Sequence, residues 1–334
     1  MPNFSIGVDL GGTNLRIAAV DEHGNFLERV SLPTHVSLGP NYVIKAMCES
    51  IRQLGERHRA TGELAGIGVG IPGIIDPETG LLREAENLPG WAGVPVQAEI
   101  ERQLGTRVVL ENDANAAALG EKWLGAARDF DDIAMLTLGT GVGGGLILGG
   151  KIFRGMSGMA GEFGHMTIDW EGIPCSCGSR GCLEQYGSAS AIIRMARDMA
   201  RREGASETFK TACSSPGFNA KSVYDLAVQG DERAKEIFHS VGRSLGIAIA
   251  DLVNAMNLPI YVIGGGVSGA WDAFAPSLFE ELRHRSAVYA ATEPSPDVER
   301  SSKAAKGKTL IARALLCGEG GLYGAARLPV VSGS

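Results

Sequence analysis

Apolar and polar residues alternate along the opening residues of the chain, with the two-residue period of a half-buried strand. The alternation predicts a strand over residues 4–10, followed by a glycine turn at 11–14. A second strand is predicted over Leu15–Val20 and a third over Phe26–Ser31, with a turn at 22–25 between them. The chain therefore opens with consecutive strands joined by short turns.

Helical and strand patterns follow in turn. Apolar residues recur at three- and four-residue spacing between Tyr42 and Gly55, which predicts a helix with one buried face. Short apolar runs at Ile67–Ile71 and Val108–Leu110 predict buried strands. An alanine-rich segment after the second run predicts a helix that ends near Leu124. Strands interspersed with helices indicate an α/β fold.

The strand pattern starts again after a charged stretch at 129–132. The elements of this second set are a strand at Ile133–Leu138, a glycine-rich loop at Gly139–Gly145, a strand at Leu146–Leu148 and, after a Gly149-Gly150 turn, a strand at Lys151–Phe153. Residues 8–13 and 136–141 look like two versions of one unit. This weak repeat predicts two similar α/β domains that face each other across a cleft.

The rest of the chain is mostly helical by pattern. Asp231–Asn254 keeps the three-and-four apolar spacing throughout, which predicts a long helix with a buried face. Further elements are helices at Ala189–Arg202, Trp271–His284 and Gly320–Arg327, a buried strand at Ile260–Ile263 ahead of Gly264-Gly265-Gly266, and a surface insertion or loop at Thr292–Lys308.

Composition narrows the class of protein. The 334 residues suffice for two domains of ordinary size, and 44% apolar residues suffice for a sizeable core. The formal charge of −7 argues against a nucleic-acid-binding surface, which is normally basic. The amino terminus lacks a basic segment followed by a long apolar run, and the apolar runs are too short to span a bilayer. We therefore expect a soluble, cytoplasmic protein without nucleic-acid or membrane partners.

Three of the six cysteines lie within eight residues of one another, with a histidine shortly upstream. The set is His165, Cys175, Cys177 and Cys182. One imidazole and three thiolates can close a tetrahedron around Zn²⁺, with ligand distances of about 2.0–2.3 Å. Four protein ligands leave no position for water, so the predicted zinc is structural. The alternative is three unrelated buried thiols and a loop histidine.

Glycines and carboxylates complete this segment. Gly178 and Gly181 allow a tight turn between the last two sulfurs. Glu162 and Glu184 bracket the predicted zinc loop, and two carboxylates held in place suit recognition of a polyhydroxylated ligand. Taken singly, either glutamate is better explained as a solvated surface residue, and only its position beside the metal motif favours a ligand contact.

Two nominal nucleotide fingerprints in the glycine-rich loop fail on their context. Gly139-x-Gly141-x-x-Gly144 has the dinucleotide-binding spacing, but an apolar strand follows it where a helix is required. Gly145-x₄-Gly150-Lys151 resembles a Walker phosphate loop, but Ile152 stands where a hydroxyl residue must bind Mg²⁺. Both types of site are rejected.

A matched pair of glycine- and threonine-rich turns remains. Their N–H groups can form anion-binding concavities, and Thr13 and Thr140 add hydroxyl donors. Two such turns facing each other could hold the β- and γ-phosphates of a nucleotide. Asp9, just before the first turn, is placed to organise Mg²⁺ through water. The alternative is that both turns are ordinary hairpins.

Asp113 follows a short buried strand and opens a helix. It can serve as the helix N-cap, where aspartate is favoured, or as the base that accepts a proton from an attacking hydroxyl. Asn112 beside it can both donate to and accept from sugar hydroxyls. α/β proteins bind ligands at strand ends, which favours the second role. The two roles of Asp113 are compatible, because a base can also lie at the start of a helix.

Six segments together resemble the ROK family (repressors, uncharacterised reading frames and sugar kinases) of the actin-like ATPase superfamily. They are D-L-G-G-T-N-L-R (9–16), E-N-D-A-N-A-A-A-L-G-E (111–121), L-G-T-G-V-G-G-G (138–145), G-E-F-G-H-M-T-I-D (161–169), C-S-C-G-S-R-G-C-L-E (175–184) and V-I-G-G-G-V-S (262–268). They run through most of the chain in family order and look most like those of bacterial glucokinases. The charged Thr292–Lys308 segment is longer than the resemblance predicts.

The resemblance implies a role for each matching residue. Asp113 is then the catalytic base. The hexose contacts are Asn112, Glu162, His165 and Glu184, with Gly73 and Asn87 completing the pocket, and His165 is shared between zinc and a sugar hydroxyl. The residues expected at the nucleotide are Asp9, Gly11, Gly12, Thr13, Asn14, Thr140 and Gly141 around the phosphates and Gly265 and Gly266 against the adenosine.

The resemblance also implies fold and activity. It predicts two actin-like, ribonuclease H-like domains: a small one of residues 1–124 with the carboxyl-terminal helix at about 318–334, and a larger one of 125–317 with the zinc loop and dimerisation helices. The predicted reaction is phosphorylation of the 6-hydroxyl of glucose by Mg·ATP, in a homodimer. Fructose, mannose, N-acetylglucosamine or N-acetylmannosamine is the alternative substrate, and polyphosphate an alternative donor.

Two other function classes are disfavoured. A sugar-sensing repressor of this family needs a DNA-binding module ahead of the first turn, and only eight residues precede Asp9. A zinc hydrolase needs an open metal position, which the four-ligand set does not provide.

Overall fold

The computed structural model describes residues 3–85, 88–295 and 305–332. The chain forms two compact units, one of Met1–Ile133, Gly145–Gly161 and Leu315–Ser334, the other of Ala134–Gly144 and Glu162–Ala314. Across the three described stretches, no helix is both long and apolar enough to cross a membrane. Because residues 86–87 and 296–304 lie outside the described residues, so do predicted Asn87 and the middle of the predicted Thr292–Lys308 insertion.

Five strands in the described part of the chain form a first sheet, in the order β3-β2-β1-β4-β7. They are β1 (Asn3–Leu10), β2 (Asn14–Asp21), β3 (Phe26–Pro33), β4 (Glu63–Ile71) and β7 (Val109–Asn112). The first three are antiparallel hairpin neighbours, and β4 and β7 continue the sheet in parallel with β1. The first glycine turn therefore lies at the same edge as the carboxyl ends of β4 and β7.

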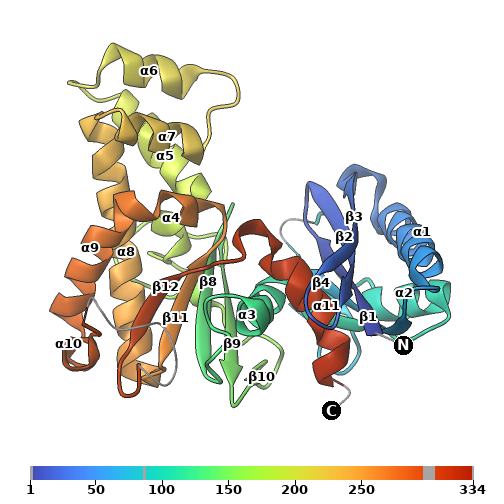
Figure 1. The fold of residues 1–334 in the computed structure, drawn as a ribbon. Helices are drawn as coiled ribbons and strands as arrows, with labels where there is room; N and C mark the ends of the chain where they lie inside the picture. Colours follow the sequence, from blue (N-terminus) through green and yellow to red (C-terminus); the bar gives the residue numbers. More distant parts are fainter. Residues whose placement is uncertain (1–2, 86–87, 296–304, 333–334) are drawn as a thin grey trace. The chain divides into compact units, whose positions relative to one another are not determined.

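Helices cover both faces of this sheet (Figure 1). The apolar residues of β1 pack with α1 (Pro40–His58) and α2 (Val96–Leu104) in one core. The opposite face meets α11 (Gly320–Ser332), which also packs along α3 (Asp113–Leu124). This contact depends on glycine: a side chain at Gly7 would come within 2.5 Å of the Leu322 carbonyl oxygen. The expectation of a half-buried first strand is thus wrong, because α11 buries the alternate positions as well.

A second sheet repeats the plan of the first. Its order within the described residues is β10-β9-β8-β11-β12, so three consecutive strands again stand beside two later ones. The strands are β8 (Ile133–Leu138), β9 (Val142–Leu148), β10 (Lys151–Ile152), β11 (Ile260–Gly264) and β12 (Leu310–Arg313); β5 (Ile74–Ile75) and β6 (Leu82–Glu84) form a separate hairpin. The predicted repeat is therefore confirmed as two sheets of one strand order.

Helices dominate between β10 and β12. They are α4 (Glu184–Gly187), α5 (Ala189–Ala200), α6 (Glu207–Ser214), α7 (Ala220–Val228), α8 (Glu232–Met256), α9 (Trp271–Arg285) and α10 (Ala287–Thr292). α8 and α9 lie side by side because Gly242 and Gly246 let the backbones approach: an added side chain would meet the carbonyls of Phe274 and Leu278 at 2.1 and 2.7 Å (Figure 1). The long helix predicted over Asp231–Asn254 is confirmed, with Asp231 as its N-cap.

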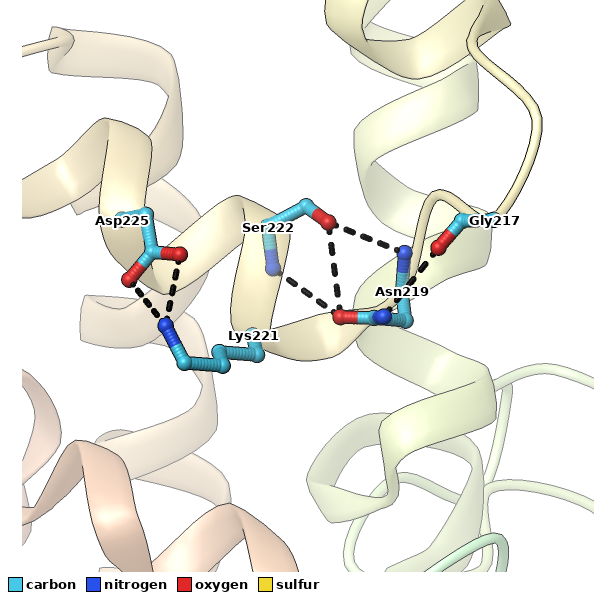
Figure 2. A network of polar contacts seen from close by, with 5 residues as sticks. All are labelled: Gly217, Asn219, Lys221, Ser222 and Asp225. Carbon is cyan, nitrogen blue, oxygen red and sulfur yellow. Dashed lines mark hydrogen bonds and ion pairs between the residues drawn. The ribbon is translucent and has the colours of Figure 1, made fainter.

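α7, which the apolar pattern did not predict, starts at a capping box (Figure 2). The side-chain oxygen of Asn219 accepts from the Ser222 N–H at 3.1 Å, and the Ser222 hydroxyl accepts from the Asn219 N–H at 3.3 Å. Lys221 pairs with Asp225 one turn on, at 2.7 Å. The sequence N-A-K-S carried this start signal.

One predicted loop is a strand in the structure. Gly139–Gly145 was expected to be a glycine-rich loop, but β9 already begins at Val142. A side chain at Gly145 would come within 2.7 Å of the Ala114 carbonyl oxygen, so this glycine serves the packing of β9 against α3. The turn itself is confined to Gly139–Gly141.

Candidate functional site

The predicted metal ligands come together. The ligand atoms of His165, Cys175, Cys177 and Cys182 all lie within 4.8 Å of one another. Nδ1 of His165 lies 3.7 Å from the Cys175 sulfur, and the Cys177 and Cys182 sulfurs are 3.7 Å apart. A tetrahedral zinc with bonds of about 2.0–2.3 Å separates its ligand atoms by roughly 3.5–3.8 Å. The residues therefore fit a zinc ion, with Nδ1 of His165 as the nitrogen ligand.

The thiols alone are in electrostatic conflict. Burial raises the pKa of Cys175, but hydrogen bonds from Cys177 and His165 outweigh it and bring that pKa down to about 6. Burial and the thiols of Cys175 and Cys177 raise the pKa of Cys182 to about 12. Like charges this close cannot all ionise. A divalent cation at their centre removes the conflict, because it stabilises all three thiolates together.

The chain around the cluster is shaped for this convergence. Gly178 and Gly181 have positive φ angles of 89° and 64°, and a side chain at Gly181 would strike the Asp169 carbonyl oxygen at 1.6 Å. Thr167 and Cys182 form an isolated antiparallel bridge. The Tyr186 hydroxyl accepts from the Ile173 N–H at 3.1 Å. The loop is thus compact although few of its residues are apolar.

Glu184 joins the zinc loop to the second glycine turn. Its Oε2 accepts from the Val142 N–H at 2.8 Å, and a side chain at Gly141 would lie 2.2 Å from the same oxygen. At the other end of the loop, a side chain at Gly164 would lie 2.0 Å from the Val142 carbonyl oxygen. Both ends of the zinc loop therefore dock at the residue that follows the turn. The Glu162 carboxylate lies 4.0 Å from Nε2 of His165, the other nitrogen of the ring.

The second turn, Gly139–Gly141, is closed by backbone and serine contacts. The Gly139 N–H donates to the Gly141 carbonyl at 2.9 Å, and the Ser190 hydroxyl donates to the Thr140 carbonyl at 2.8 Å. The first residue of α5, Ala189, donates to the Gly139 carbonyl at 2.8 Å. None of these bonds uses the side-chain hydroxyl of Thr140.

The first turn, in the other unit, is braced by a buried threonine. The Thr34 hydroxyl donates to the Gly11 carbonyl at 2.6 Å, and its N–H donates to the Thr13 carbonyl at 2.9 Å. The Gly11 N–H donates to the Asn14 carbonyl at 2.9 Å. None of these bonds uses the N–H of Gly12 or Thr13, and both residues are exposed. The turn therefore presents donors outward.

Asp9 is buried at the end of β1 and pairs with Arg16, the residue opposite it on β2. Burial raises the pKa of Asp9, and the Arg16 guanidinium opposes that shift. Magnesium is usually bound by one or two carboxylates with several waters. Because Arg16 already contacts the Asp9 carboxylate, a magnesium bound here would reach that carboxylate through water.

Asn112 and Asp113 lie where β7 becomes α3. The N-cap is Asn112 and not Asp113: its Oδ1 accepts from the N–H groups of Ala114 and Asn115 at 2.9 and 3.2 Å. Its Nδ2 donates to the Gly73 carbonyl at 3.1 Å, so two predicted pocket residues are in contact. Asp113 is the first residue of the helix, where its negative charge interacts favourably with the helix macrodipole.

Glu111 and Arg154 fix this helix start and were not predicted. The buried Glu111 carboxylate accepts from Arg154 at 2.7 Å, from the Asn115 amide at 3.0 Å and from the Asn112 N–H at 2.9 Å. Both residues, with Asn112 and Asp76, line a pocket of about 260 Å³ in the first unit. The sequence signal that could have identified Glu111 is a carboxylate directly after an apolar strand, inside the 111–121 segment.

The remaining predicted residues occupy the second unit. Gly265 follows β11 with a φ of 81°, and a side chain there would strike the Leu138 carbonyl oxygen at 2.4 Å. Gly266 opens a short 3₁₀ helix (Gly266–Ala270), with nothing within 4 Å of an added Cβ. The predicted residues thus divide between units: Asp9, 11–14, Gly73, Asn112 and Asp113 in the first, and the others that the structure describes in the second.

Comparison with known proteins decides the family. The family described as ROK matches residues 5–315. The chain belongs to the ROK family. It is 40% identical to a glucokinase of Thermotoga maritima over 290 residues, which cover 86% of this chain and 89% of that protein. It is 32% identical to a putative xylose repressor of Caldicellulosiruptor over 279 residues, 83% of this chain and 68% of that one.

A solved structure gives the same relation in three dimensions. A ROK family glucokinase from Streptomyces griseus, in complex with glucose and AMPPNP, superposes with a TM-score of 0.79 at 32% identity, covering 97% of this chain and 98% of that chain. The α/β fold of this ROK protein, with two five-stranded sheets in its described residues, is therefore the actin-like kinase fold that the sequence predicted.

Proposed function

We propose that this ROK protein is an ATP-dependent hexose kinase that phosphorylates the 6-hydroxyl of glucose. The similarity to the Thermotoga maritima glucokinase over most of both chains carries the proposal. Within this chain, the start of α3 supports it, because the Asp113 carboxylate adjoins the Asn112 amide there at a strand end, and that amide keeps one N–H for a sugar hydroxyl.

In the proposed reaction, Asp113 accepts the proton of the 6-hydroxyl as that oxygen forms its bond to the γ-phosphorus. The bond between the γ-phosphorus and the β–γ bridging oxygen breaks, and ADP leaves with the electron pair. General-base assistance of this kind contributes about 10²–10⁴-fold. The role of Asn112, Glu111 and Arg154 is to position the base, since their hydrogen bonds fix the backbone that carries Asp113.

The two turns are proposed to hold the phosphates. Gly11, Gly12 and Thr13 of the first turn, extended by Asn14, offer outward N–H donors and a hydroxyl. Thr140 and Gly141 offer the same set in the second unit, and Gly265 and Gly266 lie against the adenosine. Magnesium, when bound near Asp9, neutralises charge on the phosphates.

The sugar is proposed to contact Asn112, Glu162, His165 and Glu184, with Gly73 beside Asn112. His165 can serve two ligands, because Nδ1 lies 3.7 Å from the Cys175 sulfur and Nε2 lies on the side of Glu162, at 4.0 Å. The zinc ion itself would keep this surface in place and take no part in the phosphoryl transfer.

A second candidate is a kinase for another hexose. It is favoured by the 30% identity to an N-acetyl-D-glucosamine kinase of Haemophilus influenzae over 273 residues. A site built to bond a particular hydroxyl rejects analogues that leave its buried polar groups unpaired.

The test is formation of the sugar phosphate with glucose, fructose, mannose, N-acetylglucosamine and N-acetylmannosamine as acceptors and ATP or polyphosphate as donor. ADP release follows the reaction where ATP is the donor. We expect the highest kcat/KM with glucose and ATP, and glucose 6-phosphate as the product by NMR. Preference for another sugar would replace the substrate in this proposal. The absence of phosphorylation with every acceptor and donor would refute a sugar kinase.

A further inference from the structure

The segment by which the chain re-enters the first unit is held from two sides. The second unit ends at Ala314 and the last stretch of the first begins at Leu315. From there a short 3₁₀ helix (Cys317–Glu319) leads into α11. We call Leu315–Glu319 the return segment. It is one of the covalent connections between the two units, and its backbone is held by side chains of the first unit.

Glu121, at the end of α3, binds the N–H side of the return segment. Its side chain is fully buried, and its carboxylate accepts from the N–H groups of Leu315 and Leu316 at 3.1 and 2.8 Å. It also accepts from the Ala126 N–H at 2.7 Å, where the chain leaves α3. A buried carboxylate requires such donors, since an uncompensated charge there is strongly unfavourable. Glu121 is therefore a fixed anchor of the return segment.

Arg16 binds the carbonyl side of the same segment. Its guanidinium donates to the Gly318 carbonyl at 2.5 Å and pairs with the Asp9 carboxylate. Asp9 also lies against the start of α11, where a side chain at Gly321 would come within 3.2 Å of its Oδ2. One side chain thus connects the carboxylate before the first glycine turn to the return segment.

We propose that Arg16 is a positioning residue that couples ligand binding at Asp9 to the return segment. The inference rests on the proposed magnesium–nucleotide site. Asp9 can be paired by Arg16 or attract a hydrated magnesium that carries the phosphates. When the cation draws the Asp9 carboxylate away from Arg16, the guanidinium bonds the Gly318 carbonyl more fully. The return segment is then held more tightly while the first turn is occupied.

Amide hydrogen exchange of the peptide that contains Leu315 and Leu316 tests this coupling, with and without saturating Mg²⁺·AMPPNP. We expect bound nucleotide to slow exchange in this peptide by about tenfold in the parent protein. A factor of this size corresponds to one charge-assisted hydrogen bond. In Arg16→Met, the ligand-dependent change should fall to less than about twofold, while basal exchange rises. Arg16→Lys keeps the charge but lacks the fork, so it should retain only part of the change.

Arg29→Met is the matched control. Arg29 contacts the return segment through Glu319, at 3.6 Å, and does not pair with Asp9, so its removal should leave the ligand-dependent change in place. Calorimetry of Mg²⁺·AMPPNP binding separates the two proposals. If the parent protein binds no nucleotide, the proposed function fails together with the coupling. If it binds nucleotide but exchange of the return segment stays constant, or if Arg16→Met responds like the parent, the coupling alone is wrong.

Discussion

The two glycine turns share a sequence pattern but are stabilised by different chemistry. Gly11–Thr13 is held by the core of its own unit, through the buried Thr34 and the Asp9–Arg16 ion pair. Gly139–Gly141 is followed by Val142, whose N–H is held by Glu184 at the end of the zinc loop. The first turn therefore depends on contacts within its own unit, and the second depends in addition on the loop that carries the cysteine–histidine cluster. Substitutions that weaken one set of contacts should therefore affect one turn and leave the other unchanged.

The largest separation should come from breaking the metal cluster. Cys182→Ser removes a fully buried ligand, and structural zinc sites contribute about 10–16 kcal/mol of apparent binding free energy. We expect bound zinc to fall from about one equivalent to none, with loss of sugar binding. Metal analysis and thermal unfolding measure both. Cys213→Ser, a buried cysteine outside the cluster, is the control that should keep its zinc. A Cys182→Ser protein with full zinc and the parental melting temperature contradicts the assignment.

A smaller effect is expected from Glu184→Ala, which leaves the zinc ligands in place. The variant loses a charge-assisted bond to Val142, a type that contributes about 1.5–3 kcal/mol. We expect exchange of the Val142 amide to increase by roughly 10–100-fold, because this factor corresponds to that free energy. Zinc content should stay at the parental level. Unchanged exchange of the Val142 amide would show that the zinc loop does not stabilise the second turn.

The corresponding change at the first turn is Thr34→Val. It removes the hydroxyl bond to Gly11 and should lower the free energy of unfolding by about 0.5–1.5 kcal/mol. We expect weaker nucleotide binding and unaltered zinc content. Thr61→Val provides the control, because the Thr61 hydroxyl also donates to a carbonyl, that of His58, but far along the chain from either turn. Equal nucleotide affinity in both variants would show that Thr34 does not position the turn.

The smallest effect concerns acid sensitivity of the first unit. Hydrogen bonds from Arg83 and from the Thr79 N–H lower the pKa of Asp76 to about 2. Its contribution to stability is therefore present above the unfolded pKa near 3.9 and is lost as pH falls toward about 2. We expect the stability difference between the parent and Asp76→Asn to be constant from pH 7 to 5 and to narrow below about pH 4. Urea unfolding across pH measures it, and a difference that widens in acid contradicts the sign.

Sequence patterns predicted most elements because each has a clear period or a clear motif. α8 has a long apolar stripe, β1 alternates, and the zinc ligands are close together in the chain. α2 was missed because its nine residues carry few apolar positions, and β12 because its four residues are too short for a period.

Long-range packing was beyond these patterns. Nothing local to β1 indicates that α11, at the far end of the chain, buries its glycine face. The same holds for Thr34, Glu121 and Arg16, whose partners are distant in sequence or lie in turns. Arg16 and Glu121 do fall within the segments that resemble the ROK family, which was the available signal.

The proposed kinase chemistry is tested most directly by single-turnover phosphorylation of glucose by Asp113→Asn, alongside glucose and AMPPNP affinities. The amide keeps the shape of the side chain but cannot accept the hydroxyl proton as a carboxylate does. We predict a rate lower by about 10²–10⁴-fold with both affinities within about threefold of the parent. Phosphorylation at the parental rate would contradict the assignment of Asp113 as the base.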